Sequence, residues 1–188
     1  MTNEEMWRLA KGIGNIQQNK EEALWMVDRV PKYVGRPLRN WLEIGCYGGG
    51  GLMMWSQMLA DDGVMIGITL DDNFINLQQK VESITGKRTI ILNMRSELEE
   101  TKEAVINALN GERLDGVFVD GEHTFKQIEK ETELYTPLVR TPGVFAYHDI
   151  AGGIGTNAEY YQQKRFNISY EEKRIPGNGM KGVGIFLL

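Results

Sequence analysis

Five short apolar runs, separated by segments with helical periodicity, limit the folds open to this 188-residue chain more than any other feature. The runs are rich in β-branched and aliphatic residues and are apolar on both faces, which is typical of buried parallel strands. They cover residues 40–46, 64–70, 89–94, 116–121 and 144–150. Apolar residues at three- and four-residue steps predict an amphipathic helix after each of the first four runs. This alternation predicts an α/β fold with a doubly wound, mostly parallel sheet that is covered on both sides.

The two ends of the chain depart from this alternation. Residues 1–35 predict one or two helices, which we expect to form a lid or cap on a single domain covering residues 1–188. Near the C-terminus, an alternating run at 168–175 and an apolar run at 182–188 flank the turn-forming segment 176–181 (PGNGMK). We therefore expect the chain to end in an antiparallel hairpin.

The net charge and the cysteine content restrict the classes of binding partner and the cellular compartment that we expect. The chain carries 21 Lys and Arg against 26 Asp and Glu, a formal net charge of −5, whereas a protein that grips a nucleic-acid backbone needs a basic face. No apolar stretch approaches the roughly 18 residues of a membrane span. Cys46 is the one cysteine, so no intrachain disulfide can form, and the first twenty residues show no secretory signal pattern. We expect a cytoplasmic protein with neither nucleic-acid nor membrane partners.

The first apolar run ends in an acid followed by a glycine-rich turn. Glu43 stands two residues before the turn GCYGGGG at 45–51, at the strand end where open sheets of this type bind ligands. Glycines let a ligand approach the backbone, and the helix that follows offers unpaired N–H groups. The spacing departs from the dinucleotide pattern G-x-G-x-x-G, because Tyr47 stands at the second glycine position. Glu43 either accepts hydrogen bonds from a cofactor ammonium group or braces the turn.

The fourth and fifth runs end in acids and histidines. Asp120, Glu122 and His123 follow the fourth run, and His148 and Asp149 close the fifth, so both histidines of the chain fall at neighbouring strand ends. Histidine exchanges protons near neutral pH, which suits a general base. Two carboxylates at neighbouring strand ends suit Mg²⁺, with Glu122 as the nearest third ligand. Other readings stay open: Asp120 as a helix cap, Glu122 as a solvated turn residue and His123 as a backbone-bonded turn residue.

Three segments together carry a resemblance to a known family. They are LEIGCYGGGG at 42–51, DGVFVDGEHTFKQIEKETELYTPLVRTPGVFAYHDI at 115–150 and GVGIFLL at 182–188. The chain resembles class I S-adenosylmethionine-dependent methyltransferases. Among them it most resembles the small-molecule and sugar O-methyltransferases whose fourth strand ends in Asp-Gly-acid-His and whose fifth ends in His-Asp. The resemblance implies a seven-stranded Rossmann-like sheet with an antiparallel last strand, and S-adenosylmethionine bound across the tips of the first three strands.

The resemblance also assigns residues to the cofactor. The family's second strand usually ends in an acid that takes the ribose hydroxyls, whereas Thr69 stands there in this chain. Asp71 is the candidate replacement, because two residues further along a strand it would face the same side. Arg95 stands where the family tends to place an acid, just before Ser96 and near the adenine. The implied cofactor-binding residues are Glu43, Gly45, Cys46, Gly49, Gly51, Thr69, Asp71, Ser96 and Asp120.

The leading hypothesis is an S-adenosylmethionine-dependent O-methyltransferase with Mg²⁺ assistance, acting on a small hydroxylated acceptor such as a sugar, a glycan end or a natural product. Such a reaction needs a base for the acceptor proton. We expect His148 to be that base, with His123 as the second candidate and Asp120 reaching both cofactor and substrate. We expect Asp120, Asp149 and Glu122 to hold the metal.

Two other function classes remain open, and the acceptor is not specified. A non-catalytic methyltransferase-like binding domain is motivated by Thr69 and Arg95. A nicotinamide-dependent oxidoreductase is disfavoured by the glycine spacing. The chain is short and has few insertions, which leaves self-association into a homo-oligomer as one way to complete an acceptor pocket.

Overall fold

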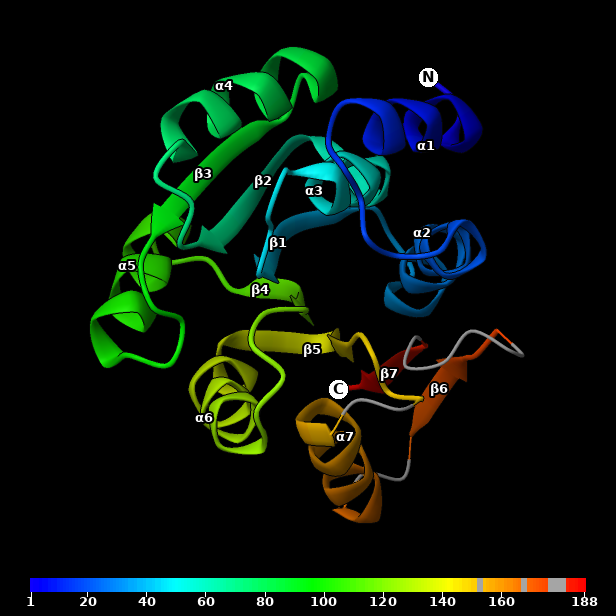
Figure 1. Ribbon diagram of the computed structural model, residues 1–188, viewed down its shortest axis with the longest axis vertical. Coiled ribbons are helices and arrows are strands. Elements are labelled where there is room, and N and C mark those ends of the chain that lie inside the picture. The colour runs from blue at the N-terminus through cyan, green and yellow to red at the C-terminus, as the bar shows by residue number, and fades with distance from the viewer. Residues whose placement is uncertain (152–153, 167–168, 176–181) are drawn as a thin grey trace.

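A seven-stranded sheet runs through the computed structural model, which describes residues 1–151, 154–166, 169–175 and 182–188. The strands lie in the order β3-β2-β1-β4-β5-β7-β6 (Figure 1). In chain order they are β1 (Leu38–Ile44), β2 (Leu59–Thr69), β3 (Arg88–Asn93), β4 (Leu114–Val119), β5 (Val139–Tyr147), β6 (Tyr170–Lys173) and β7 (Val183–Leu187). β1 to β5 pair in parallel, and β7 runs antiparallel to both β5 and β6. The predicted sheet with a reversed last strand is confirmed.

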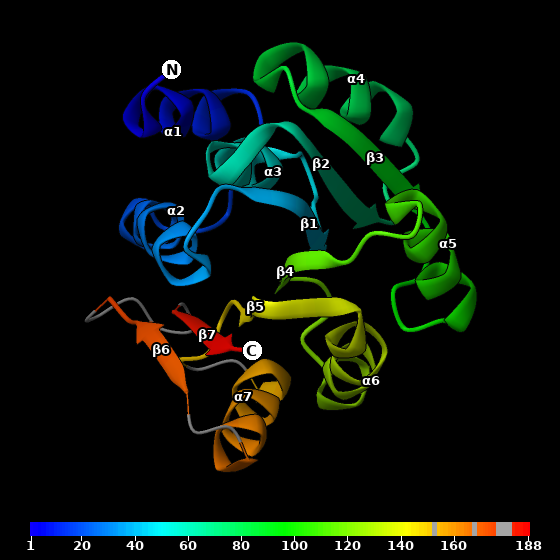
Figure 2. The ribbon, with the colours of Figure 1, turned by 180° about the vertical axis from the view of Figure 1, so that it is seen from behind.

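Helices cover both faces of the sheet, as strands buried on both faces require. They are α1 (Asn3–Gly12), α2 (Lys20–Val34), α3 (Gly50–Trp55), α4 (Phe74–Thr85), α5 (Glu99–Leu109), α6 (Phe125–Tyr135) and α7 (Ile154–Phe166), with short 3₁₀ turns at Ser56–Met58 and Thr136–Leu138. Helices α1 to α4 contribute to one apolar core and α5 to α7 to a second. Trp41 and Leu42 are neighbours in β1 and point into different cores. Figures 1 and 2 show the sheet between these two groups of helices.

All five predicted strands begin earlier than their apolar runs, three by one or two residues and two by five. β2 begins at Leu59 rather than at residue 64, and β5 begins at Val139 rather than at residue 144. Both added segments include exposed residues, and both lie beside register shifts in the partner strands β1 and β4. Exposed, irregularly paired ends have no need of apolar side chains, so an apolar pattern does not reveal them.

The elements at the two ends of the chain form as predicted. The N-terminal helices α1 and α2 each start with a capping box, formed by Thr2 with Glu5 and by Asn19 with Glu22. The C-terminal hairpin consists of β6 and β7, while its connecting segment 176–181 lies outside the described residues. Within the described part of the chain, no helix is both long and apolar enough to cross a bilayer.

Candidate functional site

The carboxyl ends of β1, β2, β4 and β5 meet at one edge of the sheet, and the residues that follow them stay bonded to the neighbouring strand. Gly45 donates its N–H to β2 at 2.9 Å, Asp120 to β1 at 2.9 Å and His148 to β4 at 3.0 Å. Because these bonds continue the strand register by one residue, the acids and histidines predicted at separate strand ends are brought to one place.

The glycine turn after β1 depends on glycine at two of its positions. Gly45 has φ of +87°, and a Cβ there would overlap the carbonyl oxygen of Asp120. Gly49 has φ of +82°, and a Cβ there would overlap side chains of α4. The turn is covered by the loop between α1 and α2, since Gly50 N donates to Gly14 O at 3.0 Å. The turn therefore lies between the sheet edge and the N-terminal segment.

Glu43 is buried beneath this turn, with 2% of its surface exposed. Its Oε1 accepts a hydrogen bond from Trp55 Nε1 at 3.1 Å, whereas its Oε2 has no partner among the described residues. Burial raises the pKa of Glu43 to about 8, and the Trp55 hydrogen bond offsets this only in part. A Cβ at Gly51 would overlap the Glu43 carboxylate. These contacts fit a bracing role, and they leave the second carboxylate oxygen buried without a partner among the described residues.

Two buried glutamates predict how stability depends on pH. The pKa of Glu43 is raised to about 8 and that of Glu131 to about 7, from an ordinary value of 4.5. The folded state therefore holds more protons than the unfolded state between about pH 4.5 and these values, so stability falls as pH rises through that range. We expect a loss of about 4 kcal/mol between pH 6 and pH 9, or about 10 °C in Tm. Glu43→Gln keeps the acceptor for Trp55 without the charge, so its Tm should fall less.

Thermal unfolding at the two pH values measures this dependence. Glu103→Gln, a substitution on the exposed side of α5, is the matched control and should follow the wild-type protein. A Glu43→Gln variant that loses as much Tm as the wild-type protein would show that Glu43 does not titrate in this range.

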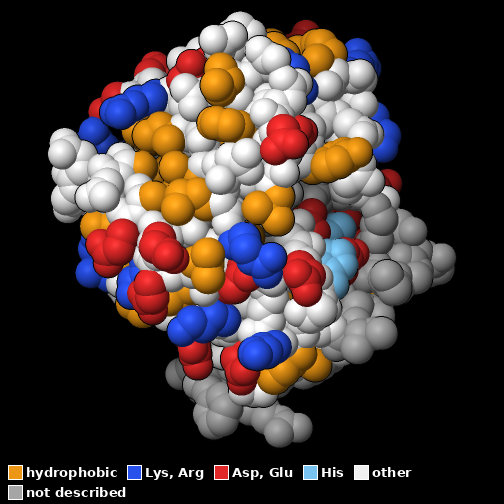
Figure 3. Space-filling model, turned by 60° about the vertical axis from the view of Figure 1, so that its left-hand side comes forward, with side chains coloured by type: hydrophobic (Ala, Val, Ile, Leu, Met, Phe, Trp, Pro, Cys, Tyr) orange, Lys and Arg blue, Asp and Glu red, His pale blue; other side chains and the backbone are white. Residues whose placement is uncertain are grey.

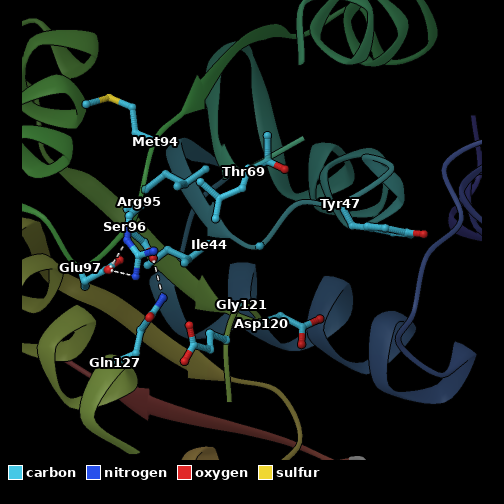
Figure 4. Close-up of a pocket in the computed structure, with 14 residues that line it drawn as sticks. Ile44, Tyr47, Thr69, Met94, Arg95, Ser96, Glu97, Asp120, Gly121 and Gln127 are labelled. Carbon is cyan, nitrogen blue, oxygen red and sulfur yellow. Dashed lines mark hydrogen bonds and ion pairs between the residues drawn. The ribbon is translucent and has the colours of Figure 1, made fainter. Parts of the chain in front are cut away.

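A cavity of about 290 Å³ opens between the ends of β1, β2 and β3 and the start of α6 (Figure 4). Four of the expected cofactor residues line it: Gly45, Thr69, Ser96 and Asp120. A hollow of about 20 Å³ lies on the other side of the turn, against loop residues 14–18. Glu43, Cys46 and Gly51 line this hollow, as do Gly45 and Asp120. The two spaces share Gly45 and Asp120, so they adjoin at the tip of β1.

Two expected cofactor residues, Gly49 and Asp71, are not among the residues that line either space. Gly49 instead allows the close approach of α4. β2 ends at Thr69, so Asp71 lies in the following turn and not on the strand face that was predicted for it. There its amide N–H donates to Thr69 Oγ1 at 3.1 Å, and its Oδ1 accepts from the Asn73 amide at 2.9 Å. Thr69 is therefore the polar β2 residue that lines the cavity, beside Ile68 of the same strand.

His148 is enclosed by three carboxylates and is only 2% exposed. Its Nε2 lies 3.3 Å from Glu22 Oε2. Its Nδ1 lies 3.2 Å from Asp120 Oδ1 and 3.3 Å from Asp149 Oδ1, without the alignment of a directed hydrogen bond to either. Burial alone would lower the pKa of His148, but the charge of Asp120 and the other two acids raise it well above 6.5. The three acids around His148 therefore favour its protonated form.

His123 lies at the open side of the same cluster, with 39% of its side chain exposed. Its Nε2 is 3.3 Å from Asp149 Oδ2 and 3.7 Å from Asp120 Oδ1. Contact with Asp120 raises the pKa of His123, and partial burial opposes the shift. Figure 3 shows histidine side chains in a recess beside acidic side chains. Of the two predicted base candidates, His123 is the more exposed.

Three groups of the cluster form a potential cation site. One ligand atom each from Asp120, His123 and Asp149 lie within 4.8 Å of one another. The expected third ligand, Glu122, is not a member of this group: its Oε1 accepts from Thr124 Oγ1 at 3.0 Å. Two carboxylates and an imidazole form a donor set that fits a divalent cation.

Two residues of the N-terminal segment complete the cluster and were not anticipated. Gln18 Nε2 donates to Asp120 Oδ2, and Glu22 contacts His148 while accepting from the Asn19 amide at 2.9 Å. Burial would raise the pKa of Glu22, but the His148 and Asn19 contacts lower it. The capping-box spacing from Asn19 to Glu22 was the available signal, yet it explains Glu22 without any reference to a site.

A family model described as a methyltransferase domain matches residues 42–150, which is more than half of the chain. The matched region holds the glycine turn and both acid–histidine strand ends. A search of curated proteins finds no match.

Solved structures share the fold at low sequence identity. The O-methyltransferase from Bacillus cereus in complex with SAH has a TM-score of 0.68 at 12% identity, covering 99% of this chain and 90% of that chain. TomG from Streptomyces achromogenes, an O-methyltransferase involved in tomaymycin synthesis solved with SAM, has a TM-score of 0.61 at 14% identity, covering 100% and 99%. The methyltransferase MycE from mycinamycin biosynthesis, solved with Mg, SAH and mycinamycin VI, has a TM-score of 0.68 at 16% identity, covering 98% of this chain and 54% of that chain. At these identities the similarity establishes the fold.

Proposed function

The chain belongs to the methyltransferase-domain family, and from that premise we propose that it is an S-adenosylmethionine-dependent O-methyltransferase acting on a small hydroxylated acceptor. The observation that carries the proposal is the meeting of a glycine-turn cavity with a cluster of Asp120, Asp149 and two histidines at one sheet edge. The cavity supplies a place for a donor, and the cluster supplies a base for an acceptor hydroxyl.

The two adjoining spaces lie where we place the two ends of the cofactor. The larger cavity, with Thr69 and Ser96 in its wall, suits the nucleoside. We place the amino-acid end beside Glu43, whose unpartnered Oε2 would accept from an ammonium group. The hollow there, of about 20 Å³, has room for little more than one water, so the loop over it must move aside to admit this group. When bound, S-adenosylmethionine would supply a methyl group on a sulfonium sulfur for transfer to the acceptor oxygen, and the demethylated thioether would be the leaving group. Loop residues 14–18 lie over this hollow, which supports a lid role for the N-terminal segment.

We assign the base role to His123 Nε2. It takes the proton of the acceptor hydroxyl, which leaves the oxygen with the electron pair that forms the new O–C bond. Asp120 and Asp149 flank this nitrogen and stabilise the ring once it is protonated. His148 remains buried and cationic, and its role is to keep Asp120 and Asp149 in place. His148 as the base stays the competing prediction.

Mg²⁺ is the proposed metal, held by Asp120 and Asp149. Mg²⁺ prefers oxygen ligands and retains waters, so it leaves the imidazole of His123 free to accept a proton. A metal at this place would lower the pKa of a bound hydroxyl and orient it toward the base. The Mg printed for MycE supports this assignment.

The acceptor class follows from the neighbours and from the openness of the cluster. TomG and MycE belong to the biosynthesis of natural products, which supports a hydroxylated natural product or sugar as acceptor. The acidic balance of the chain argues against nucleic acid. We propose that the protein works in the cytoplasm, and that a second copy completes the acceptor pocket.

Calorimetry and thermal unfolding with S-adenosylmethionine and its demethylated product test the proposal. A ligand at 100 times its Kd stabilises the folded state by about 2.7 kcal/mol, so Tm should rise by about 5–10 °C. Absence of heat and of any Tm shift at millimolar ligand would refute cofactor binding. Binding without methyl transfer across a broad acceptor screen would instead support the non-catalytic binding domain.

A further inference from the structure

The wall of the larger cavity nearest α6 rests on a buried acid, Glu131, which is 0% exposed. Its Oε1 accepts hydrogen bonds from Ser96 Oγ at 2.5 Å and from Gln127 Nε2 at 3.2 Å. Ser96 and Gln127 line the cavity, as Figure 4 shows, whereas Glu131 is not among the lining residues. Glu131 thus lies behind two side chains that face the ligand space.

The chemistry of a carboxylate decides how these two side chains are oriented. An ionised carboxylate only accepts hydrogen bonds. Ser96 must therefore donate its one hydroxyl proton to Glu131, and Gln127 must point its NH₂ group toward Glu131. Gln127 Nε2 also lies 3.4 Å from Ser96 Oγ. Ser96 Oγ and Gln127 Oε1 therefore present only lone pairs to the cavity, which means that they accept hydrogen bonds from a ligand.

We propose that Glu131 is a positioning residue that makes this wall hydrogen-bond accepting, and that it thereby selects a 6-aminopurine nucleoside over a 6-oxopurine. The inference rests on the proposed function, because it concerns the nucleoside end of that cofactor. An exocyclic amino group donates to the lone pairs of the wall. A carbonyl oxygen at the same place can only accept, so it would face unpaired acceptors in a buried setting.

The surroundings of Glu131 set the conditions of the test. Burial raises its pKa to about 7; hydrogen bonds from Ser96 and Gln127 oppose this, and the charges of Glu97 and Glu122 add to it. Tyr135 also faces this region and donates its hydroxyl to the carbonyl oxygen of Ser96 at 2.7 Å. Above pH 7 the carboxylate form predominates, so measurements at pH 8 examine the acceptor-only state.

The experiment compares the affinity of the whole protein for S-adenosylhomocysteine and for S-inosylhomocysteine by calorimetry at pH 8. We expect the wild-type protein to prefer the amino form by about tenfold or more. In Glu131→Gln the new amide can donate to Ser96 Oγ, which frees the serine proton to point into the cavity. We expect this variant to bind S-adenosylhomocysteine within about threefold of wild type and to lose most of the preference.

The controls separate this role from general support of the fold. Glu133→Gln removes an exposed charge from the same helix and should keep the wild-type preference. Ser96→Ala removes one acceptor and should weaken the preference even if Glu131→Gln does not fold. A full preference in Glu131→Gln or in Ser96→Ala, or no preference in the wild-type protein, overturns the inference. A wild-type protein that binds neither thioether overturns the proposed function as well.

Discussion

Replacing His123 with alanine is expected to lower kcat by about 10²–10⁴-fold, the contribution typical of a general base, while cofactor affinity stays within about threefold of wild type. The reason is position: His123 is 39% exposed and contacts both Asp120 and Asp149, so it can accept a proton from a bound hydroxyl and share the resulting charge with them. Its side chain is not among the residues lining either cofactor space. Single-turnover methyl transfer, with cofactor Kd measured separately, gives both quantities.

Two further measurements decide whether the loss is chemical. Because the ring is accessible to solvent, added imidazole should restore part of the rate of His123→Ala. His123→Gln keeps an N–H group near Asp120 but cannot take up a proton, so it should be as slow as the alanine variant. If His123→Ala reacts at the wild-type rate while a folded His148→Ala is slow, the base is His148.

We expect His148→Ala to lower the stability of the fold, whereas we expect His123→Ala to lower the reaction rate. The substitution leaves Glu22, Asp120 and Asp149 close together without their shared cation, and breaking a buried ion pair is strongly destabilising, by about 3–5 kcal/mol. We expect a lower Tm before any effect on rate is considered. The two histidines therefore have different expected roles: His148 is enclosed by acids, whereas His123 is open to solvent.

The parallel sheet and its alternation with helices could be predicted because strands buried on both faces appear in the sequence as continuous apolar runs. A run such as 64–70 has apolar residues on both sides, and the positive φ of Gly45 agrees with a glycine turn at the end of the first strand. The meeting of Asp120, His123 and Asp149 could also be predicted, since parallel strands end at one edge. These features depend on local sequence and on topology alone.

Other parts of the site depend on contacts that local patterns do not encode. Gln18 and Glu22 reach the cluster from more than one hundred residues away in the chain. Asp71 was expected to face the cavity on strand geometry, but the strand stops two residues earlier. Glu131 reads as one more polar residue in a helix rich in glutamate, and only the approach of Ser96 gives it a role. Long-range packing supplies this information.

Removal of divalent metal is expected to lower the rate of methyl transfer by about 10–100-fold, and added Mg²⁺ should restore it. The expectation rests on Asp120 and Asp149, which each place a carboxylate oxygen within 4.8 Å of the other and of a His123 ring nitrogen. Both acids also contact Nδ1 of His148. Chelation followed by a titration with MgCl₂ measures the effect on rate. Calorimetry with MgCl₂ alone measures binding without reference to activity.

Asp149→Asn is the sharpest variant for this site. Asp149 has φ of +56°, a conformation that asparagine tolerates as readily as aspartate, so the backbone should not move. The variant removes one carboxylate charge, and we expect Mg²⁺ affinity to fall at least about tenfold. Glu122→Gln removes the same charge from an exposed neighbour outside the cluster and should bind Mg²⁺ as the wild-type protein does.

Two outcomes would contradict this assignment. If Glu122→Gln loses Mg²⁺ binding and Asp149→Asn keeps it, Glu122 is a metal ligand, as the sequence predicts, and the cluster of Asp120, His123 and Asp149 is not the metal site. If His123→Gln alone abolishes binding, the imidazole is a ligand, and it cannot also be the base.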